Sequence, residues 1–211
     1  MTQTMEIDSG AIPVWPQHLS IELVHRTPTI GRIRFDDNAL YHEALFEALA
    51  EAEEDRTRAA PRAGGHARIE EFDAWDVPEA ELLRLRAVKF CRALMNTSAI
   101  ALQSADVLVV RRGQQIPAHQ PEHSVASRTY VLSGDTDFLF QHASLAQHRF
   151  IVPEDTRPGD CFAVPNDMAP TEPALASRLP LILVRFWFRP VPCTRLSLPT
   201  RYSCYRTLWP T

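Results

Sequence analysis

The chain has 211 residues, 45% of them hydrophobic, and a formal net charge of -4 at pH 7. This length fits one domain with a sizeable core, and the slightly acidic balance gives no electrostatic reason to expect nucleic acid or an anionic membrane as a partner. The four cysteines stand far apart without Cys-x-x-Cys spacing. That spacing indicates free thiols in a reducing cytoplasm rather than a disulfide framework or a zinc site.

The N-terminal residues do not resemble a signal peptide. Residues 1–10 are polar and acidic, unlike a signal peptide, and no stretch approaches the ~20 apolar residues that span a bilayer. We therefore expect a soluble, cytoplasmic, single-domain protein over residues 1–211. Within it we expect an N-terminal part with helices over 1–97, a barrel core over 98–190, and an apolar tail over 191–211 that drapes over the barrel.

The N-terminal part is expected to hold short strands and two helices. Residues 1–20 look like an irregular arm, whereas 21–24 and 30–35 alternate like strands. Apolar spacing predicts helices over 39–55 and 80–96. The first helix has two apolar stripes, Leu40, Ala44, Ala48 and Ala52 beside Tyr41, Leu45 and Leu49. The second helix has one stripe, formed by Leu83, Ala87, Phe90, Cys91 and Leu94.

The segment between the two helices, residues 56–68, is rich in Gly, Pro and Arg. We interpret it as a disordered connection. The alternative is a lid that carries Arg62, His66 and Arg68 over a pocket.

From Ser98 onward the pattern changes to short apolar runs separated by Gly, Pro and Asp turn signals, without a helical period. Such runs predict a mainly β fold with N-terminal helices, namely a small antiparallel barrel or jelly roll. The expected strands are 99–103, 106–112, 127–132, 136–140, 148–152, 160–165 and 179–188.

Two histidines in this region are the candidate catalytic and metal-binding residues. His119 and His123 follow Pro117, and alternate residues on an extended segment share one face. Two imidazoles on one barrel wall, with Glu122 nearby, could bind a divalent iron, zinc or nickel ion. The spacing does not assign the third ligand, and its candidates are Glu122, Asp167, His142, His148 and Glu172.

Two arginines are candidates for binding a carboxylate. Arg128 lies within the apolar alternation of residues 127–132, so its guanidinium could point into the barrel, where a bidentate carboxylate ligand would pair it. The alternative for Arg128, and for Arg178, is an outward-facing arginine in a surface salt bridge. On the last strand, Phe186 and Trp187 alternate between the core and a second face.

Several of these motifs resemble one family. Residues 31–40 resemble the opening of bacterial proline hydroxylases. The motifs Ile116-Pro-Ala-His119, Arg128-Thr-Tyr130, Gly159-Asp-Cys-Phe-Ala-Val164 and a last strand ending Phe-Trp-Phe-Arg-Pro190 resemble the aspartyl/asparaginyl hydroxylase group of 2-oxoglutarate- and iron(II)-dependent dioxygenases. The resemblance spans residues 29–190. It implies a double-stranded β-helix, as in cupins, that binds iron(II) and 2-oxoglutarate and hydroxylates a C–H bond.

Carried over residue by residue, the resemblance is incomplete at the metal site. His119 matches the first iron histidine, and Arg128, Arg178 and Tyr130 become candidate cosubstrate-binding residues. The carboxylate position two residues after His119 is Pro121, as in some aspartyl hydroxylases that also lack it. The distal histidine should follow Val164-Pro165, where this chain reads Met168-Ala-Pro170. Proline has no ligating side chain.

Three hypotheses about function therefore stay open. The first is an oxygenase-like enzyme that hydroxylates a small amino acid or a carboxylate-bearing biosynthetic intermediate, with iron held by His119, His123 and a non-standard third ligand. The second is a metal-independent isomerase, cyclase or lyase of the same fold that uses His119 or His123 as general base. The third is a non-catalytic partner subunit, for which Tyr205 and Trp209 would form an apolar face. A small molecule is the expected substrate, and a homodimer is an oligomeric state that the sequence allows.

Overall fold

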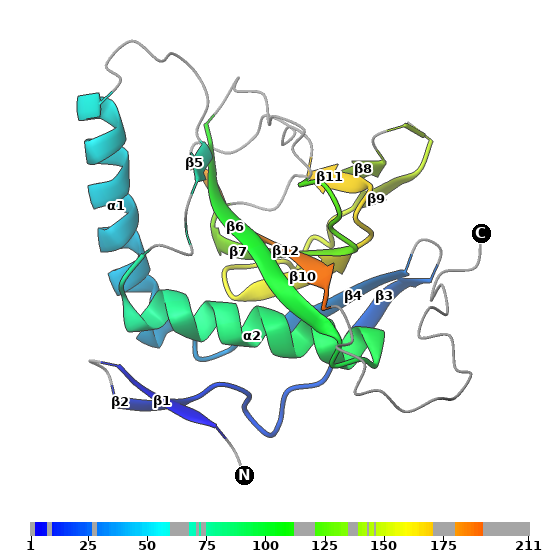
Figure 1. Ribbon diagram of the computed structural model, residues 1–211, viewed down its shortest axis with the longest axis horizontal. Coiled ribbons are helices and arrows are strands. Elements are labelled where there is room, and N and C mark those ends of the chain that lie inside the picture. Colours follow the sequence, from blue (N-terminus) through cyan, green and yellow to red (C-terminus); the bar gives the residue numbers. More distant parts are fainter. Residues whose placement is uncertain are drawn as a thin grey trace, which may run out of the picture.

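The computed structural model describes residues 3–7, 10–26, 29–59, 68–70, 72, 75–111, 121–134, 139–142, 144–145, 147–170 and 180–191. Within these ranges, the molecule contains three antiparallel sheets, one of them a two-stranded hairpin, and two long helices (Figure 1). Neither helix of the described chain is long and apolar enough to cross a membrane.

The larger sheet has seven strands, all paired antiparallel. In spatial order they are β3 (Glu22–Arg26), β4 (Thr29–Arg34), β10 (Asp160–Val164), β7 (Ala126–Ser133), β12 (Leu181–Pro190), β6 (Ile100–Val110) and β5 (Arg68–Glu70). The smaller sheet has the order β11 (Met168–Pro170), β8 (Leu139–His142) and β9 (Arg149–Ile151). The chain passes between the sheets as a jelly roll does, so the expected double-stranded β-helix with N-terminal helices is confirmed.

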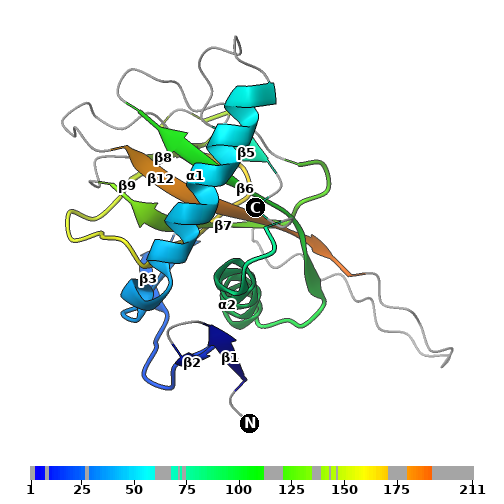
Figure 2. The same cartoon turned by 90° about the vertical axis from the view of Figure 1, so that its left-hand side faces the viewer.

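The two faces of the larger sheet are buried against different layers, and Figure 2 shows both helices on one side of it. On the helix side the core includes Val107, Tyr130, Leu132, Cys161, Phe186 and Phe188, packed on α1 and α2. On the other side, the barrel interior, it includes Leu108, Val131, Phe162, Leu183, and Phe140 and Phe150 of the smaller sheet. Because both faces are buried, the central strands are buried at nearly every position and do not alternate between buried and exposed residues.

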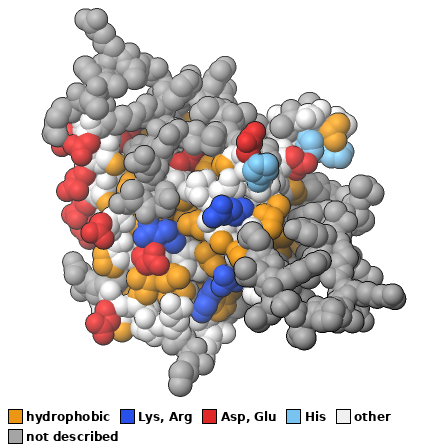
Figure 3. Space-filling model, viewed as in Figure 1, with side chains coloured by type: hydrophobic (Ala, Val, Ile, Leu, Met, Phe, Trp, Pro, Cys, Tyr) orange, Lys and Arg blue, Asp and Glu red, His pale blue; other side chains and the backbone are white. Residues whose placement is uncertain are grey.

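Helix α1 (His42–Ala59) follows the short 3-10 turn η1 (Asn38–Leu40). Of its two predicted stripes, the one with Tyr41, Leu45 and Leu49 is buried, whereas Leu40 of the alanine-rich stripe is 50% exposed. The opposite face carries exposed acidic residues, and acidic side chains line that edge of the molecule in Figure 3. The helix therefore packs on the sheet through the stripe with Tyr41, Leu45 and Leu49, while its acidic face is exposed to solvent.

Helix α2 (Pro78–Met95) lies across the sheet below α1 (Figure 1). Pro78 occupies the first turn, where its missing N–H is not needed, and Asn96 ends the helix in the left-handed conformation at φ 49°. Its predicted stripe is confirmed: Leu83, Ala87, Phe90 and Cys91 are buried in the helix-side core, and Leu94 is partly buried against it.

Two predictions about strands were wrong, and not every strand was predicted. Residues 1–20 contain a hairpin of β1 (Thr4–Ile7) and β2 (Gly10–Pro13) rather than an irregular arm, and β1 packs against α2. Strand β6 runs unbroken where two strands were expected, with a bulge opposite Trp187 and Phe188. Strand β11 was not predicted, because three residues that include a proline carry no alternation signal.

Candidate functional site

The register of strand β7 shows which face of the sheet the candidate residues Arg128 and Tyr130 lie on. Arg128 is paired with Phe186 and Ala163, which belong to the helix-side core, and Tyr130 belongs to that core itself. Since alternate residues of a strand point to opposite faces, both side chains lie between the sheet and the helices. Arg128 therefore follows neither of the two alternatives considered for it: its guanidinium does not point into the barrel interior, and it is buried rather than in a surface salt bridge.

The Tyr130 hydroxyl is the centre of a buried hydrogen-bond chain on the helix side. It lies 2.6 Å from Nε2 of His42 and 3.0 Å from the hydroxyl of Tyr41. Arg86 of α2 donates from Nη1 to the Tyr41 hydroxyl at 3.1 Å and pairs with the Asp37 carboxylate through Nη1 and Nη2. Burial raises the pKa of both tyrosines, so both stay neutral, and the chain ties both helices to the sheet.

His42 is the titratable end of this chain. Burial lowers the pKa of its imidazole to about 4, and the nearby Asp37 carboxylate opposes that shift only in part. The imidazole is therefore neutral near pH 7, and its Nε2 shares a hydrogen bond with the Tyr130 hydroxyl. The sequence offered one signal for this residue, a histidine in the first turn of a helix beside an apolar stripe.

We expect the free energy of unfolding to fall as the pH is lowered from about 6.5 to about 4, because the unfolded chain protonates its imidazole in this range and the folded chain does not. At ~1.4 kcal/mol per pKa unit, the loss from His42 reaches about 3 kcal/mol near pH 4. Urea titrations of wild type and His42→Gln at several pH values measure this loss. The glutamine can still hydrogen-bond to Tyr130 but does not titrate.

The matched control for that series is His148→Gln, because His148 is exposed. The control should keep the wild-type pH dependence, whereas His42→Gln should be flatter between these two pH values. Parallel curves for wild type and His42→Gln would show that His42 is not the group responsible.

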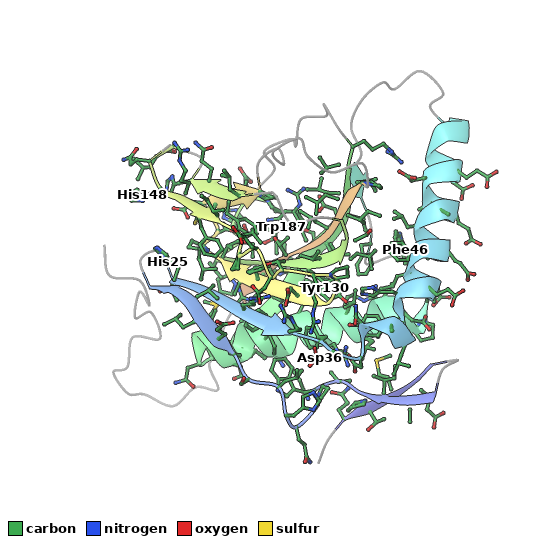
Figure 4. The ribbon with its side chains drawn as sticks, turned by 180° about the vertical axis from the view of Figure 1, so that it is seen from behind. His25, Asp36, Phe46, Tyr130, His148 and Trp187 are labelled. Carbon is green, nitrogen blue, oxygen red and sulfur yellow. The ribbon has the colours of Figure 1, made fainter. Side chains whose placement is uncertain are left out.

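The barrel interior holds a different charged pair, which the sequence analysis missed. Arg185 of β12 donates from Nε and Nη2 to the two carboxylate oxygens of Asp106 on β6, at 2.9 and 2.7 Å. Both residues are almost fully buried, and the Arg185 guanidinium lies 4.7 Å from the ring centre of Trp187. Tyr130 on β7 and Trp187 on the neighbouring strand β12, both labelled in Figure 4, thus lie on opposite faces of the larger sheet.

Hydroxyl side chains lie around this pair on the interior face. Thr129 is directly opposite Arg185, while Ser104 and Ser127 are opposite Trp187 on its two neighbouring strands. The Ser104 hydroxyl is buried and has no hydrogen-bond partner among the described residues. One end of the barrel interior is therefore polar, in contrast to the apolar cluster that fills the rest.

A rim of two turns borders the polar end. The Ser124 hydroxyl donates to the carbonyl of Pro121 at 2.9 Å, and the Asn166 amide donates to the Ser124 carbonyl at 2.8 Å. Glu122 and His123 lie on this rim and are exposed, with His123 at φ 63°. The other main candidates, His119 and Arg178, lie outside the described residues, as do Glu172, Arg62 and His66.

Two of the candidate third ligands are neighbours in space. Nε2 of His142 on β8 lies 2.6 Å from the carboxylate of Asp167. The Nδ1 atom of His142 accepts hydrogen bonds from the backbone N–H groups of Ser144 and Leu145. Both ring nitrogens are thus engaged within the protein. His148 is exposed next to His142, and the centres of the two imidazole rings are 6.0 Å apart.

The donor groups of the described residues do not fit a resident iron(II) ion. Iron(II) in such sites is held by imidazole and carboxylate groups. On β11, however, the two buried side chains are Met168 and Pro170, a thioether and a residue without a donor. No group of three His, Cys, Asp or Glu side chains suited to a metal exists among the described residues. Asp106 accepts from Nε and Nη2 of Arg185, so this edge of the guanidinium is already occupied by an internal carboxylate.

The chain was compared with known proteins by sequence and by structure. No family model and no curated protein matches it in sequence. AviO1 from Streptomyces viridochromogenes Tue57 is similar in structure, with a TM-score of 0.54 and 14% identity over 75% of this chain and 86% of that one. EctD from S. alaskensis with bound Fe has a TM-score of 0.53 and 15% sequence identity, over 74% of this chain and 69% of that one.

A third solved structure is the viral collagen prolyl hydroxylase vCPH from Paramecium Bursaria Chlorella virus-1 in its 2OG complex. It gives a TM-score of 0.50 and 12% identity, over 77% of this chain and 96% of that one. At such identities the likeness concerns the fold, so the narrower resemblance to aspartyl/asparaginyl hydroxylases stays a prediction. This chain has the jelly-roll fold found in an iron-bound EctD and in a prolyl hydroxylase solved with 2OG.

Proposed function

We propose that this protein is an enzyme of the oxygenase fold that acts, without iron, on a small carboxylate-bearing or amino-acid-like biosynthetic intermediate. The substrate would bind at the polar end of the barrel, near the Arg185–Asp106 pair and beneath the rim that carries His123. The chain shares its fold with a prolyl hydroxylase solved in its 2OG complex. Fold alone does not define a reaction, so the choice depends on the side chains.

The main support for a reaction without iron is the chemistry of the side chains on the interior face of β11. Met168 and Pro170 occupy it, so this strand offers no imidazole or carboxylate to iron. Arg185 is also bound by an internal carboxylate rather than being open to a cosubstrate. Under the proposal, His119 or His123 acts as general base beside a substrate carbonyl. Imidazole is the usual protein base near neutral pH.

Exchange of hydrogen with solvent tests this proposal without knowledge of the exact substrate. The protein is incubated in D2O with small keto and amino acids, and NMR follows deuterium incorporation next to the carbonyl. Under the proposal, exchange persists with a metal chelator and is lost in His119→Ala or in His123→Ala, but not in the exposed control His148→Ala. Turnover that requires added iron(II) and forms succinate would overturn it.

Hydroxylation with iron(II) and 2-oxoglutarate is the second candidate function. It is favoured by the structural likeness to an iron-bound protein and to a hydroxylase with 2OG, and by Glu122 and His123 lying together on the rim. It requires both to converge with His119 as non-standard ligands. The same chelator experiment separates the two candidates, since only this one depends on iron.

A further inference from the structure

Arg128 is a buried arginine whose charge has no carboxylate partner among the residues that the structure describes. Its side chain is almost completely buried, with a relative exposure of 2% for the residue. Nη1 donates to the backbone carbonyl of Ser127 at 2.6 Å. The Nε and Nη2 atoms are buried without any hydrogen-bond partner in the described chain. Such unsatisfied buried donors are rare in folded proteins and require an explanation.

Three other arginines on this sheet bind a carboxylate through the Nε–Nη2 edge of the guanidinium. Arg185 uses Nε and Nη2 to hold Asp106. Arg32 and Arg34 use the same two atoms to hold Asp160, at 2.8 to 3.1 Å. This edge presents two parallel N–H groups that match the two oxygens of a carboxylate. In Arg128 the same edge is free of any such group within the described residues.

Neighbouring groups do not supply the missing negative charge. The rings of Phe90 on α2 and Phe188 on β12 flank the Arg128 guanidinium, with centres 5.1 and 5.9 Å away. The thiols of Cys91 and Cys161 are close enough to interact electrostatically, but burial raises the pKa of both, so they are neutral near pH 7. Burial lowers the pKa of Arg128 from a very high ordinary value, and the guanidinium remains charged.

We propose that the Nε–Nη2 edge of Arg128 binds the carboxylate of a small acid in the layer between β7 and α2. The site lies on the opposite face of the sheet from the Arg185–Asp106 pair, so it is independent of the function proposed for the barrel interior. The aromatic rings exclude water, and a bidentate carboxylate would satisfy both free donors and neutralise a charge that burial otherwise makes unfavourable.

Thermal unfolding with small anions tests this site. Formate and perchlorate are compared at matched ionic strength in wild type, Arg128→Met and Arg189→Met. The last variant is the control, because Arg189 is exposed at the end of β12. A ligand that binds the folded state alone raises the midpoint in a saturable way. We expect formate to raise the Tm of wild type and of the control, and to leave that of Arg128→Met unchanged.

A second measurement keeps the proposal testable if Arg128→Met does not fold. Saturation-transfer NMR follows the formate proton against the wild-type protein, with acetate as competitor. The proposal predicts one saturable site for which acetate competes. An equal response of wild-type Tm to formate and perchlorate would overturn it, and so would equal responses of wild type and Arg128→Met to formate. Absence of saturable transfer would also overturn it.

Discussion

Asp160→Asn is expected to lower the free energy of unfolding by about 3 to 5 kcal/mol, as loss of one partner does in buried ion pairs. Asp160 is completely buried at the start of β10. Its carboxylate accepts hydrogen bonds from Arg32, from Arg34 and from the backbone N–H of Arg157. Asparagine keeps the shape but removes the charge, so two guanidinium groups, one of them buried, lose the buried one of the two carboxylates that they share.

The position of Asp160 explains why the effect should be global. The two arginines lie on β4, so the carboxylate joins this strand to β10 beside their backbone pairing. The preceding Gly159 turns at φ 101°, and a Cβ there would lie 2.7 Å from the carbonyl oxygen of Phe35. The turn thus fits only glycine, and it delivers the carboxylate to both arginines.

Asp155→Asn is the matched control for Asp160→Asn, and urea unfolding measures both. Asp155 also contacts Arg32 and Arg34, but its side chain is 65% exposed. Exposed ion pairs contribute about 1 kcal/mol or less, so the control should lie close to wild type. If Asp160→Asn unfolds like Asp155→Asn, the buried carboxylate does not stabilise this part of the sheet as we describe.

Asp106→Asn is expected to be similarly destabilising, by about 3 to 5 kcal/mol, because it leaves the buried Arg185 guanidinium without its counter-ion. The double variant Asp106→Leu with Arg185→Met removes both charges together. Replacing a buried pair by apolar residues is often neutral or stabilising, so the double variant should recover most of the lost stability.

A double-mutant cycle by urea unfolding measures the coupling between these two residues. It needs the single variants Asp106→Leu and Arg185→Met beside the double one, since contacting residues show interaction energies of roughly 0.5 to 3 kcal/mol or more. Additive effects would contradict the description of Asp106 as the internal partner of Arg185. They would leave this guanidinium available to a ligand.

The sequence predicted the class of fold because the signals for it are local. Short apolar runs between turn residues gave most strands of the barrel, and the stripe of α2 gave its buried face. It did not predict which face Arg128 uses. Strand β7 is buried on both sides from Ala126 to Leu132, so its residues lack the polar alternation that would identify the barrel side.

The Arg185–Asp106 pair was missed for a related reason. Arg185 lies inside the continuous apolar run of β12, and its partner is 79 positions away in sequence. The available signal was that each is the one charged residue in an otherwise apolar buried stretch. Such residues are seldom buried unless they are paired, but pairing between distant strands requires the register, which the sequence alone did not provide.

Our central proposal is that the protein works without iron, because the barrel interior carries an internal ion pair and the described residues include no group of three His, Cys, Asp or Glu side chains suited to a metal. Anaerobic calorimetric titration with iron(II), alone and with 2-oxoglutarate, tests it most directly. We expect that the protein shows no saturable, iron(II)-dependent binding of 2-oxoglutarate. Binding of one equivalent of iron(II) together with one of 2-oxoglutarate would contradict it.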